Sequence, residues 1–363
     1  MELLAGMLGM LLILVILFDA FETVILPRRI TQRFRLARLF YKITWLPYSG
    51  AARRARSISR RDNFLALYGP LSLLMLIALW AVTLIVGFGL LQWSLHTPLR
   101  TPETSLDFFT YLYLSGSTFF TLGFGDVTPL TGWGRFAAVS EAGVGFAFLA
   151  LMIGYLPALN GAFSEREVHV SLLDERAGSP PSALELLRRH YQGEQLAGID
   201  LILHDWERWS AELLESHLSY PVLGYFRSQH DNQSWVAALT MILDASALVL
   251  VGMNEVSTRQ AQLTFAMARH AAVDLTQVLD TPPRKGDSDR VSEKDLDLIR
   301  TTLKAAGITL REGTAADQRL SELRAMYEPY VNALSYHLLM PLPPWIPPAD
   351  VPDSWQTSGW EKI

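Results

Sequence analysis

Three long runs of apolar residues divide the first 160 positions of the chain. They cover residues 3–26, 65–93 and 136–159, and together they contain only three charged side chains, all of them acids. At about 1.5 Å per residue, a helix over any of these runs is long enough to cross about 30 Å of hydrocarbon. The pattern predicts three transmembrane helices, the first of them within residues 1–27.

Basic residues predict the orientation of these helices. Residues 28–64 contain eleven Lys or Arg and one acid, Asp62. Because cytoplasmic loops are enriched in basic residues, we expect residues 28–64 to form a basic cytoplasmic loop. The segment between the second and third spans then lies outside or re-enters the membrane, and everything after about residue 160 lies in the cytoplasm.

The basic loop also contains an amphipathic pattern. Its apolar and basic residues fall on two different faces of a helix: Leu36, Leu39, Phe40 and Ile43 on one face, and Arg35, Arg38 and Lys42 on the other. This pattern is typical of an interfacial helix at the surface of the lipid bilayer. Two roles stay open for it, a passive collar and recognition of anionic lipid by residues 28–61.

Residues 161–340 read as a helical domain. Their apolar positions recur with helical spacing in six stretches: 182–191, 200–218, 234–251, 258–279, 292–306 and 317–338. Residues 341–363 follow as a proline-rich tail. The stretch 235–253 is almost long enough to span a bilayer, but Asp244 at its centre would cost about 2.5–3.5 kcal/mol in lipid. We therefore interpret it as a core helix, with a fourth span as the alternative.

Composition narrows the class of protein. Half of the residues are hydrophobic and only 18% are charged, which favours a multi-pass protein of the cell membrane over a soluble one. There is no cysteine, so thiolate metal sites and cysteine nucleophiles are excluded. Residues 161–363 carry 18 basic and 28 acidic side chains, a formal net charge of −10. We expect no nucleic-acid partner for such an acidic domain.

The segment between the second and third spans must enter and leave the membrane on the same side. Thr104 and Asp107 have the spacing of a capping box, and the apolar residues after them predict a re-entrant pore helix over 105–120. The sequence Thr-Leu-Gly-Phe-Gly-Asp follows at residues 121–126. Positive φ angles at its two glycines would let successive carbonyl groups face one axis, which is how a channel replaces the hydration shell of a cation.

This sequence resembles the filter motif Thr-Val-Gly-Tyr-Gly-Asp of the potassium channel family. The resemblance covers residues 65–160 and implies an outer helix 65–93, a pore helix 105–120, a filter 121–126 and an inner helix 134–160. A four-fold filter needs four such loops and the chain supplies one, so the implied assembly is a homotetramer.

The resemblance also assigns residues. It implies K⁺ sites formed by the carbonyl groups of Thr121, Leu122, Gly123 and Phe124 together with the Thr121 hydroxyl, and it places Asp126 beside Gly125 at the outer mouth. Gly145 resembles the gating-hinge glycine of the inner helix. One departure is that Phe124 stands where most members have tyrosine, so it lacks the hydroxyl that braces the filter.

Glu141 is the acid of the third span, six residues or about 9 Å of helix after Arg135. We expect it near the depth of the filter. It could hydrogen-bond Ser117 or Thr118 of the pore helix and brace the filter, or it could face the cavity and concentrate cations. We favour the bracing role.

The sequence thus predicts an all-α membrane protein with three transmembrane helices, a re-entrant pore helix and a helical cytoplasmic domain. Its expected function is passive, selective conduction of K⁺ by a channel that is gated or assembled through the cytoplasmic domain, without an enzymatic activity or a cofactor. The alternatives are a poorly selective cation channel and a membrane-anchored enzyme or signalling protein.

Overall fold

The computed structural model describes residues 2–26, 36–55, 57–102, 106–192, 195–196, 198–229, 232–253, 258–347 and Gln356. The chain divides into two compact units, Met1–Asn160 and Gly161–Ile363. Helices make up both units, and the described strands are only two residues long each. The predicted class, an all-α membrane protein with a helical domain, is confirmed.

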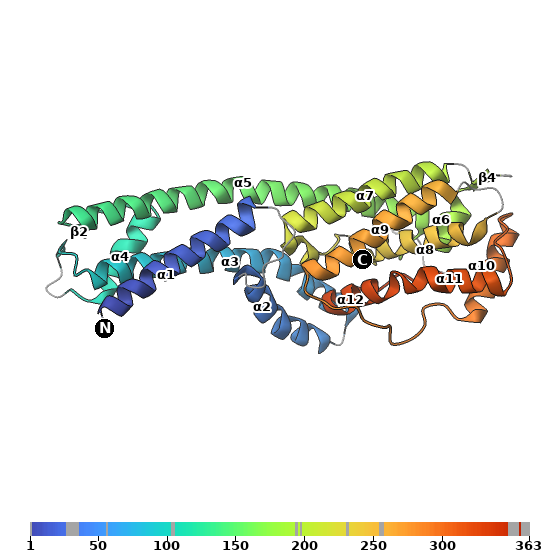
Figure 1. The fold of residues 1–363 in the computed structure, drawn as a ribbon, viewed down its shortest axis with the longest axis horizontal. Helices are drawn as coiled ribbons and strands as arrows, with labels where there is room; N and C mark the ends of the chain where they lie inside the picture. The colour runs from blue at the N-terminus through green and yellow to red at the C-terminus, as the bar shows by residue number, and fades with distance from the viewer. Residues whose placement is uncertain are drawn as a thin grey trace. The chain divides into compact units, whose positions relative to one another are not determined.

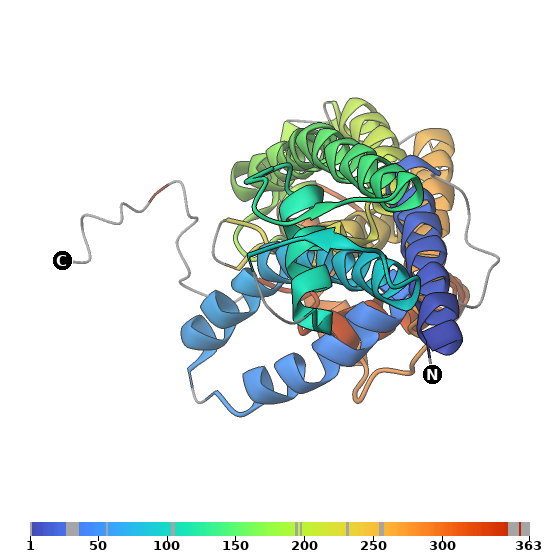
Figure 2. The same cartoon turned by 90° about the vertical axis from the view of Figure 1, so that its left-hand side faces the viewer.

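Among its described residues, the first unit has four helices and the first part of a fifth. In chain order these are α1 (Glu2–Ala20), continued by a π-helical turn (Phe21–Ile25), α2 (Leu36–Arg53), α3 (Ile58–Ser94), α4 (Phe108–Phe119) and α5 (Gly132–Ala177). The short helix α4 lies between the long helices α3 and α5 (Figure 1, Figure 2). Strand β1 (Leu99–Arg100) pairs antiparallel with β2 (Thr128–Pro129) and joins the two connections that flank α4.

Glycine residues allow α1 and α3 to approach each other closely. A Cβ atom on Gly9 would lie 2.6 Å from the carbonyl oxygen of Gly87, and one on Gly87 would lie 2.9 Å from Ile13. Small residues at such crossings let helices within a membrane gain van der Waals contact along their backbones. Gly87 therefore serves helix packing, as does Gly89, where a Cβ would lie 3.4 Å from Leu112 of α4.

Buried polar and aromatic groups hold α2 against its neighbours. The Asp19 carboxylate on α1 accepts hydrogen bonds from the Trp80 indole N–H at 2.9 Å and from the Ala37 backbone N–H at 3.3 Å, so it joins α1, α3 and the start of α2. Further along, the Thr44 and Tyr68 hydroxyl groups lie 2.9 Å apart, and the Tyr48 ring stacks on Phe64. These contacts turn one face of α2 toward α3.

The opposite face of α2 is apolar and open. Leu39, Ile43 and Leu46 are more than half exposed, and Lys42 is exposed beside them. Phe40, which the sequence grouped with this face, packs instead on the core formed by α1, α3 and α5. Arg35 lies outside the described residues.

Several predicted helix boundaries need correction. The outer helix α3 begins at Ile58 instead of residue 65 because Arg60, Arg61 and Asp62 are accommodated in its first turns. The pore helix α4 is shorter than the predicted 105–120. Its N-cap is Asp107, whose carboxylate accepts a hydrogen bond from the Thr110 backbone N–H at 3.0 Å. Thr104 lies outside the described residues.

The inner helix α5 is much longer than the predicted 134–160. Pro157, which we expected to kink or close it, lies inside the helix. A proline removes only one backbone hydrogen bond, and the glycine that follows at position 161 costs only about 1 kcal/mol inside a helix, so α5 continues past both. The helix ends at Ala177, where Gly178 takes the left-handed conformation (φ 86°) that commonly terminates helices.

In the described part of the second unit, the end of α5 is followed by seven further helices. These are α6 (Ala183–Arg189), α7 (Ile199–Ser219), α8 (Trp235–Gly252), α9 (Thr258–Val278), α10 (Glu293–Ala305), α11 (Thr314–Ala325) and α12 (Glu328–Leu338). A 3₁₀ turn (Pro221–Tyr225) follows α7, and β3 (Tyr191–Gln192) forms a hairpin with β4 (Gln195–Leu196). The predicted single helix over 317–338 is wrong, because Pro329 is favoured in a first helical turn and starts α12 there.

Helix α8 forms the core of the second unit. It contacts α6, α7, α9, α11 and α12. Its apolar stretch is 89% buried, against at most 44% in the other three described helices that have the length and composition of a membrane span. Asp244 receives two hydrogen bonds from the Arg290 guanidinium, at 2.6 and 3.1 Å, and one from the Tyr327 hydroxyl. This packing supports the interpretation of α8 as a core helix, whose central acid is paired inside protein.

The same arginine attaches the start of the proline-rich tail. The Arg290 guanidinium donates to the Pro343 carbonyl at 3.0 Å and lies 5.7 Å from the centre of the Trp345 ring. The Trp345 side chain is buried. Residues 341–347 are therefore part of the folded second unit, although they are not helical.

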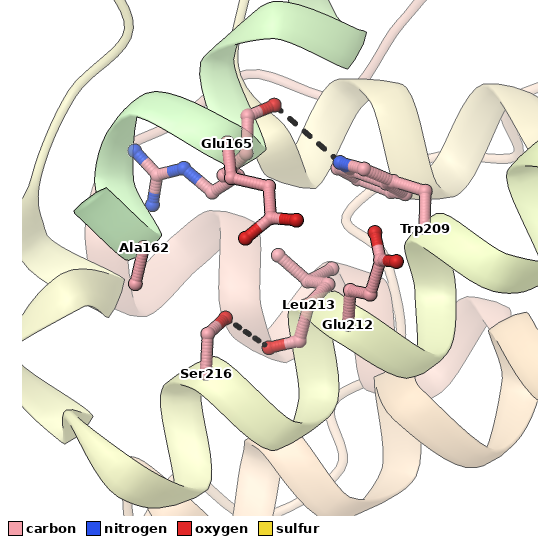
Figure 3. A pocket seen from close by; sticks show the side chains of 7 residues that line it. Ala162, Glu165, Trp209, Glu212, Leu213 and Ser216 are labelled. Atoms are coloured by element: carbon pink, nitrogen blue, oxygen red, sulfur yellow. Dashed lines mark hydrogen bonds between the residues drawn. The ribbon is translucent and has the colours of Figure 1, made fainter. Parts of the chain in front are cut away.

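The end of α5 is anchored to the second unit by Arg166. Its guanidinium donates to the carbonyl oxygens of Leu223 and Phe226, both at 2.9 Å, and its own carbonyl accepts from the Trp209 indole at 3.4 Å. Figure 3 shows the small cavity at this contact between α5 and α7. Its volume of about 20 Å³ has room for about one water molecule, so it is not a ligand site.

His217 gives this unit a predictable pH response. Burial, with a further contribution from the Arg166 charge, lowers the pKa of His217 to about 3. An unfolded chain binds a proton at this residue below about pH 6.5, whereas the folded unit does not. The stabilising contribution is present above pH 6.5 and is lost as the pH falls, by about 2 kcal/mol between pH 6.5 and 5.

We expect His217→Leu to remove this part of the pH dependence. The measurement is denaturant unfolding of the full chain in detergent at pH 7 and pH 5, followed by near-ultraviolet circular dichroism. The difference in unfolding free energy between the two pH values should be about 2 kcal/mol smaller in the variant. Equal differences in both proteins would contradict the neutral state of His217.

Candidate functional site

The connection between α4 and β2 has an unusual backbone. Thr121, Gly123 and Gly125 have positive φ angles of 56°, 60° and 77°. Left-handed residues therefore alternate with Leu122 and Phe124, which are not left-handed. Such alternation turns successive peptide groups to the same side, so their carbonyl oxygens form a row instead of pointing to both sides as in a strand. We call residues 121–126 the filter segment.

The C-terminal end of α4 positions the start of the filter segment. The backbone N–H of Thr121 donates to the Thr118 carbonyl at 3.0 Å, and that of Leu122 donates to the Ser117 carbonyl at 2.8 Å. Because the carbonyl end of a helix carries a partial negative charge, this end of α4 favours a cation beside the filter segment.

The filter segment is open on its free side. Leu122 and Phe124 are 55% and 66% exposed, and a Cβ on either Gly123 or Gly125 would meet no atom of the chain within 4 Å. The conformation at the two glycines is therefore set by the backbone and not by crowding from neighbouring side chains.

Tyr113 forms a hydrogen bond with the last residue of the filter segment. Its hydroxyl donates to the Asp126 carboxylate at 2.8 Å, and the other carboxylate oxygen accepts from the Val127 backbone N–H at 3.1 Å. Val127 itself is buried against Leu114 and neighbouring apolar residues of α4 and β1. Tyr113 of α4 thus supplies a hydroxyl group beside Asp126, which Phe124 cannot supply.

Glu141 faces α4, but at a different residue from those predicted. Its carboxyl group forms a short hydrogen bond with Ser115, and the contact is completely buried. Ser117 and Thr118 were the expected partners. Ser117 lies on roughly the opposite side of α4 from Ser115, and Thr118, which shares a face with Ser115, lies nearly one turn further along the helix, so Ser115 meets Glu141 at this level. Because Glu141 has no exposed surface, it does not line an open cavity.

Gly145 lies where α5 passes closest to α4. A Cβ atom at this position would lie 2.0 Å from the carbonyl oxygen of Phe119 and 2.9 Å from its carbonyl carbon. Real Cβ atoms essentially never approach a backbone atom so closely. The structure thus gives a packing reason for glycine here, while the hinge role stays a prediction.

Sequence reasoning missed two residues of this site, Tyr113 and Ser115. Both lie on α4, where the sequence contains four hydroxyl side chains within six positions: Tyr113, Ser115, Ser117 and Thr118. Helical spacing was the available signal, since Ser115 and Phe119 are four residues apart, as are Glu141 and Gly145. This spacing selects Ser115 only once the contact between Gly145 and Phe119 is known, and the sequence alone does not show that contact.

The comparisons with known proteins agree with this geometry. Residues 72–159 match the family model described as ion channel. The chain is 22% identical over 222 residues to the "uncharacterized membrane protein YdjJ" of Bacillus subtilis (strain 168), which covers 60% of the chain and 62% of that protein. It is 36% identical over 84 residues to "Protein LctB" of Bacillus caldotenax, which covers 20% of the chain and 62% of that protein.

The chain thus spans about three fifths of the length of these two curated relatives. No solved structure matches it significantly. The matched residues 72–159 contain α4, the filter segment and the part of α5 that carries Glu141 and Gly145. The chain is therefore a membrane protein whose residues 72–159 are similar to the two-helix pore module of the ion channel family.

Proposed function

We propose that this protein is a potassium-selective channel that conducts K⁺ passively across the cell membrane. The observation that carries the proposal is the alternation of left-handed residues at Thr121, Gly123 and Gly125. In this proposal the carbonyl oxygens of residues 121–124 and the Thr121 hydroxyl bind dehydrated K⁺. Asp126 holds the outer mouth, and the work of the protein is conduction and not catalysis.

The proposal includes assembly as a homotetramer. One chain contributes one filter segment, and a ring of carbonyl groups around an axis requires four. The exposed side of the filter segment and the exposed apolar residues of α5, such as Phe146 and Ile153, are the surfaces available to other copies. Cross-linking of the full chain in lipid should therefore stop at the tetramer.

A potassium flux assay tests the function. Purified full-length protein is reconstituted into liposomes that contain K⁺, and efflux into a K⁺-free medium is measured. We expect efflux that an equal gradient of Na⁺ does not reproduce. A second candidate, a poorly selective cation channel, is motivated by Phe124, which lacks the bracing hydroxyl, and it predicts similar K⁺ and Na⁺ fluxes. Absence of any cation flux would contradict both.

We also propose that the second unit lies in the cytoplasm and gates or assembles the channel. The basic residues of the loop between α1 and α3 support this orientation. Reporters fused after Ile363 and within residues 50–56 should therefore both be active in the cytoplasm. An external reporter at the C-terminus would mean that α8 crosses the membrane and that its burial inside the unit is not its state in the cell.

The exposed face of α2 fits the membrane surface. Leu39, Ile43 and Leu46 can enter the boundary of the acyl chains, while Lys42 reaches the headgroups. We propose anionic lipid of the inner leaflet as the partner of this face, with a passive collar as the alternative. Binding of the full chain to vesicles that contain or lack anionic lipid compares the two.

Tyr113→Phe should weaken sustained conduction. The change removes the hydroxyl that donates to Asp126. A hydrogen bond of this kind contributes about 0.5–1.5 kcal/mol in each subunit, so four copies should lower the sustained K⁺ flux about tenfold or more.

The neighbouring Tyr111→Phe is a matched control. Its hydroxyl donates to the Thr97 carbonyl at 3.0 Å, away from the filter segment. Time courses of K⁺ efflux should show a faster decay for Tyr113→Phe than for Tyr111→Phe. If both variants decay like the unmodified protein, the Tyr113–Asp126 bond does not support the filter.

A further inference from the structure

A buried series of hydrogen-bonded polar groups connects α3, α4 and α5. Ser115 of α4 is at its centre and has no exposed surface. Its Oγ lies 2.7 Å from the Ile85 carbonyl oxygen of α3 and also forms the short hydrogen bond with Glu141 Oε1 of α5. A single hydroxyl group therefore connects three helices.

Counting hydrogens decides which group donates. A serine hydroxyl has one hydrogen, a backbone carbonyl only accepts, and an ionised carboxylate also only accepts. With an ionised Glu141, Ser115 could donate to only one of its two neighbours, and the other contact would bring two acceptors together. If Glu141 carries the proton, its O–H donates to Ser115 Oγ and the Ser115 O–H donates to the Ile85 carbonyl. Both contacts are then hydrogen bonds.

The environment of the second carboxyl oxygen agrees with this count. Glu141 Oε2 is buried and has no hydrogen-bond partner among the residues that the structure describes. No described basic side chain forms an ion pair with Glu141. A bare, ionised oxygen in a fully buried site carries a much larger desolvation penalty than the carbonyl oxygen of a neutral carboxylic acid.

The hydrogen bond between Glu141 and Ser115 lies one helical turn from the contact between Gly145 and Phe119. Glu141 and Gly145 are four residues apart on α5, and their partners Ser115 and Phe119 are four residues apart on α4. Residues at this spacing lie one above the other on the same face of a helix. Helix α5 therefore holds α4 at two successive turns, through a hydrogen bond at one and a backbone contact at the other.

We propose that Glu141 is a neutral carboxylic acid at physiological pH and acts as a positioning residue, donating a hydrogen bond to Ser115 so that α4 is held between α3 and α5. The effect on conduction rests on the proposed channel function, whereas the protonation and the bridge do not. Because the carboxyl group is enclosed in its own subunit, four copies in one assembly would neither repel one another nor attract cations to the cavity.

Infrared spectroscopy of the full chain in lipid tests the protonation without any need for conduction. We expect the unmodified protein at neutral pH to show the carbonyl stretch of a protonated carboxyl group that is lost in Glu141→Gln. In Ser115→Ala the band should persist at a shifted wavenumber, since the acid keeps its proton but loses its acceptor. If the unmodified protein and Glu141→Gln give the same spectrum in the region of the carboxyl carbonyl stretch, the proposal is overturned.

Stability of the assembly tests the bridge. Glutamine can donate from its amide group to Ser115, so Glu141→Gln should keep a melting temperature close to that of the unmodified protein. Glu141→Leu has no donor and should lower it, as should Ser115→Ala. A Gln variant that melts as early as the Leu variant would overturn the donor role.

The proposed channel function and the proposed Glu141 bridge can be contradicted separately. A protein that shows the carboxyl band and the rescue by glutamine but conducts no K⁺ would leave Glu141 as a neutral bridge and remove the channel function. A protein that conducts K⁺ selectively but lacks the band would keep the function and remove the bridge.

Discussion

Replacing either Gly123 or Gly125 by alanine should abolish the K⁺ flux. Both residues have positive φ angles, 60° and 77°, which an L-residue with a Cβ adopts at a cost of about 1–3 kcal/mol. Since an assembled filter contains four copies, even the low end of this range sums to about 4 kcal/mol. That corresponds to roughly a thousandfold loss of the conducting arrangement.

The space around these glycines makes the interpretation specific. A Cβ on Gly123 or Gly125 would meet no atom of its own chain within 4 Å, so the change acts through backbone conformation and not through a clash. Gly132 is a matched control, because it also has open space around it but no positive φ. Liposome efflux should be lost in the first two variants and kept in Gly132→Ala, with tetramers present in all three. Normal efflux from Gly123→Ala would remove residues 121–126 from the ion path.

Local patterns in the sequence were sufficient for the class of the protein and for the expected positive φ angles at Gly123 and Gly125. Apolar runs of membrane length, the concentration of basic residues between two of them, and two glycines on alternate positions are all properties of neighbouring residues. The π-helical turn after α1 and the length of α5 were not predicted. Pro157 predicts the end of a helix, but α5 continues through it.

Contacts between helices were harder to predict, because they depend on how two helices are rotated relative to each other. Glu141 was expected beside α4, but the sequence offered three hydroxyl groups there and no means to choose Ser115. Tyr113 and Asp126 are thirteen residues apart, and the reversal of the chain in the filter segment brings them together. In the second unit, the pairing of Asp244 with Arg290 depends on a loop that joins α9 to α10 and could not be inferred from α8 alone.

Replacing Gly145 by alanine should disrupt the pore module itself. The new Cβ would lie 2.0 Å from the Phe119 carbonyl oxygen, and a backbone atom cannot rotate away as the end of a flexible side chain can. Either α5 or the end of α4 must move, at a cost of about 1–3 kcal/mol or more in each subunit. Phe119 is two residues before Thr121, so this movement reaches the filter segment. We therefore expect loss of sustained K⁺ flux together with a lower melting temperature of the tetramer.

The hinge interpretation of Gly145 predicts a different result. If Gly145 serves only as a hinge, its replacement by alanine should alter the open probability. The preference for K⁺ and the melting temperature should stay unchanged. Gly143→Ala separates the two, because Gly143 lies on the same helix two residues away and a Cβ there would meet nothing within 4 Å. If close packing is the reason for glycine, only Gly145→Ala destabilises the assembly. If Gly145→Ala tetramers melt like those of Gly143→Ala while their gating changes, α4 and α5 tolerate the added methyl group and the hinge explains this residue better than the contact with Phe119.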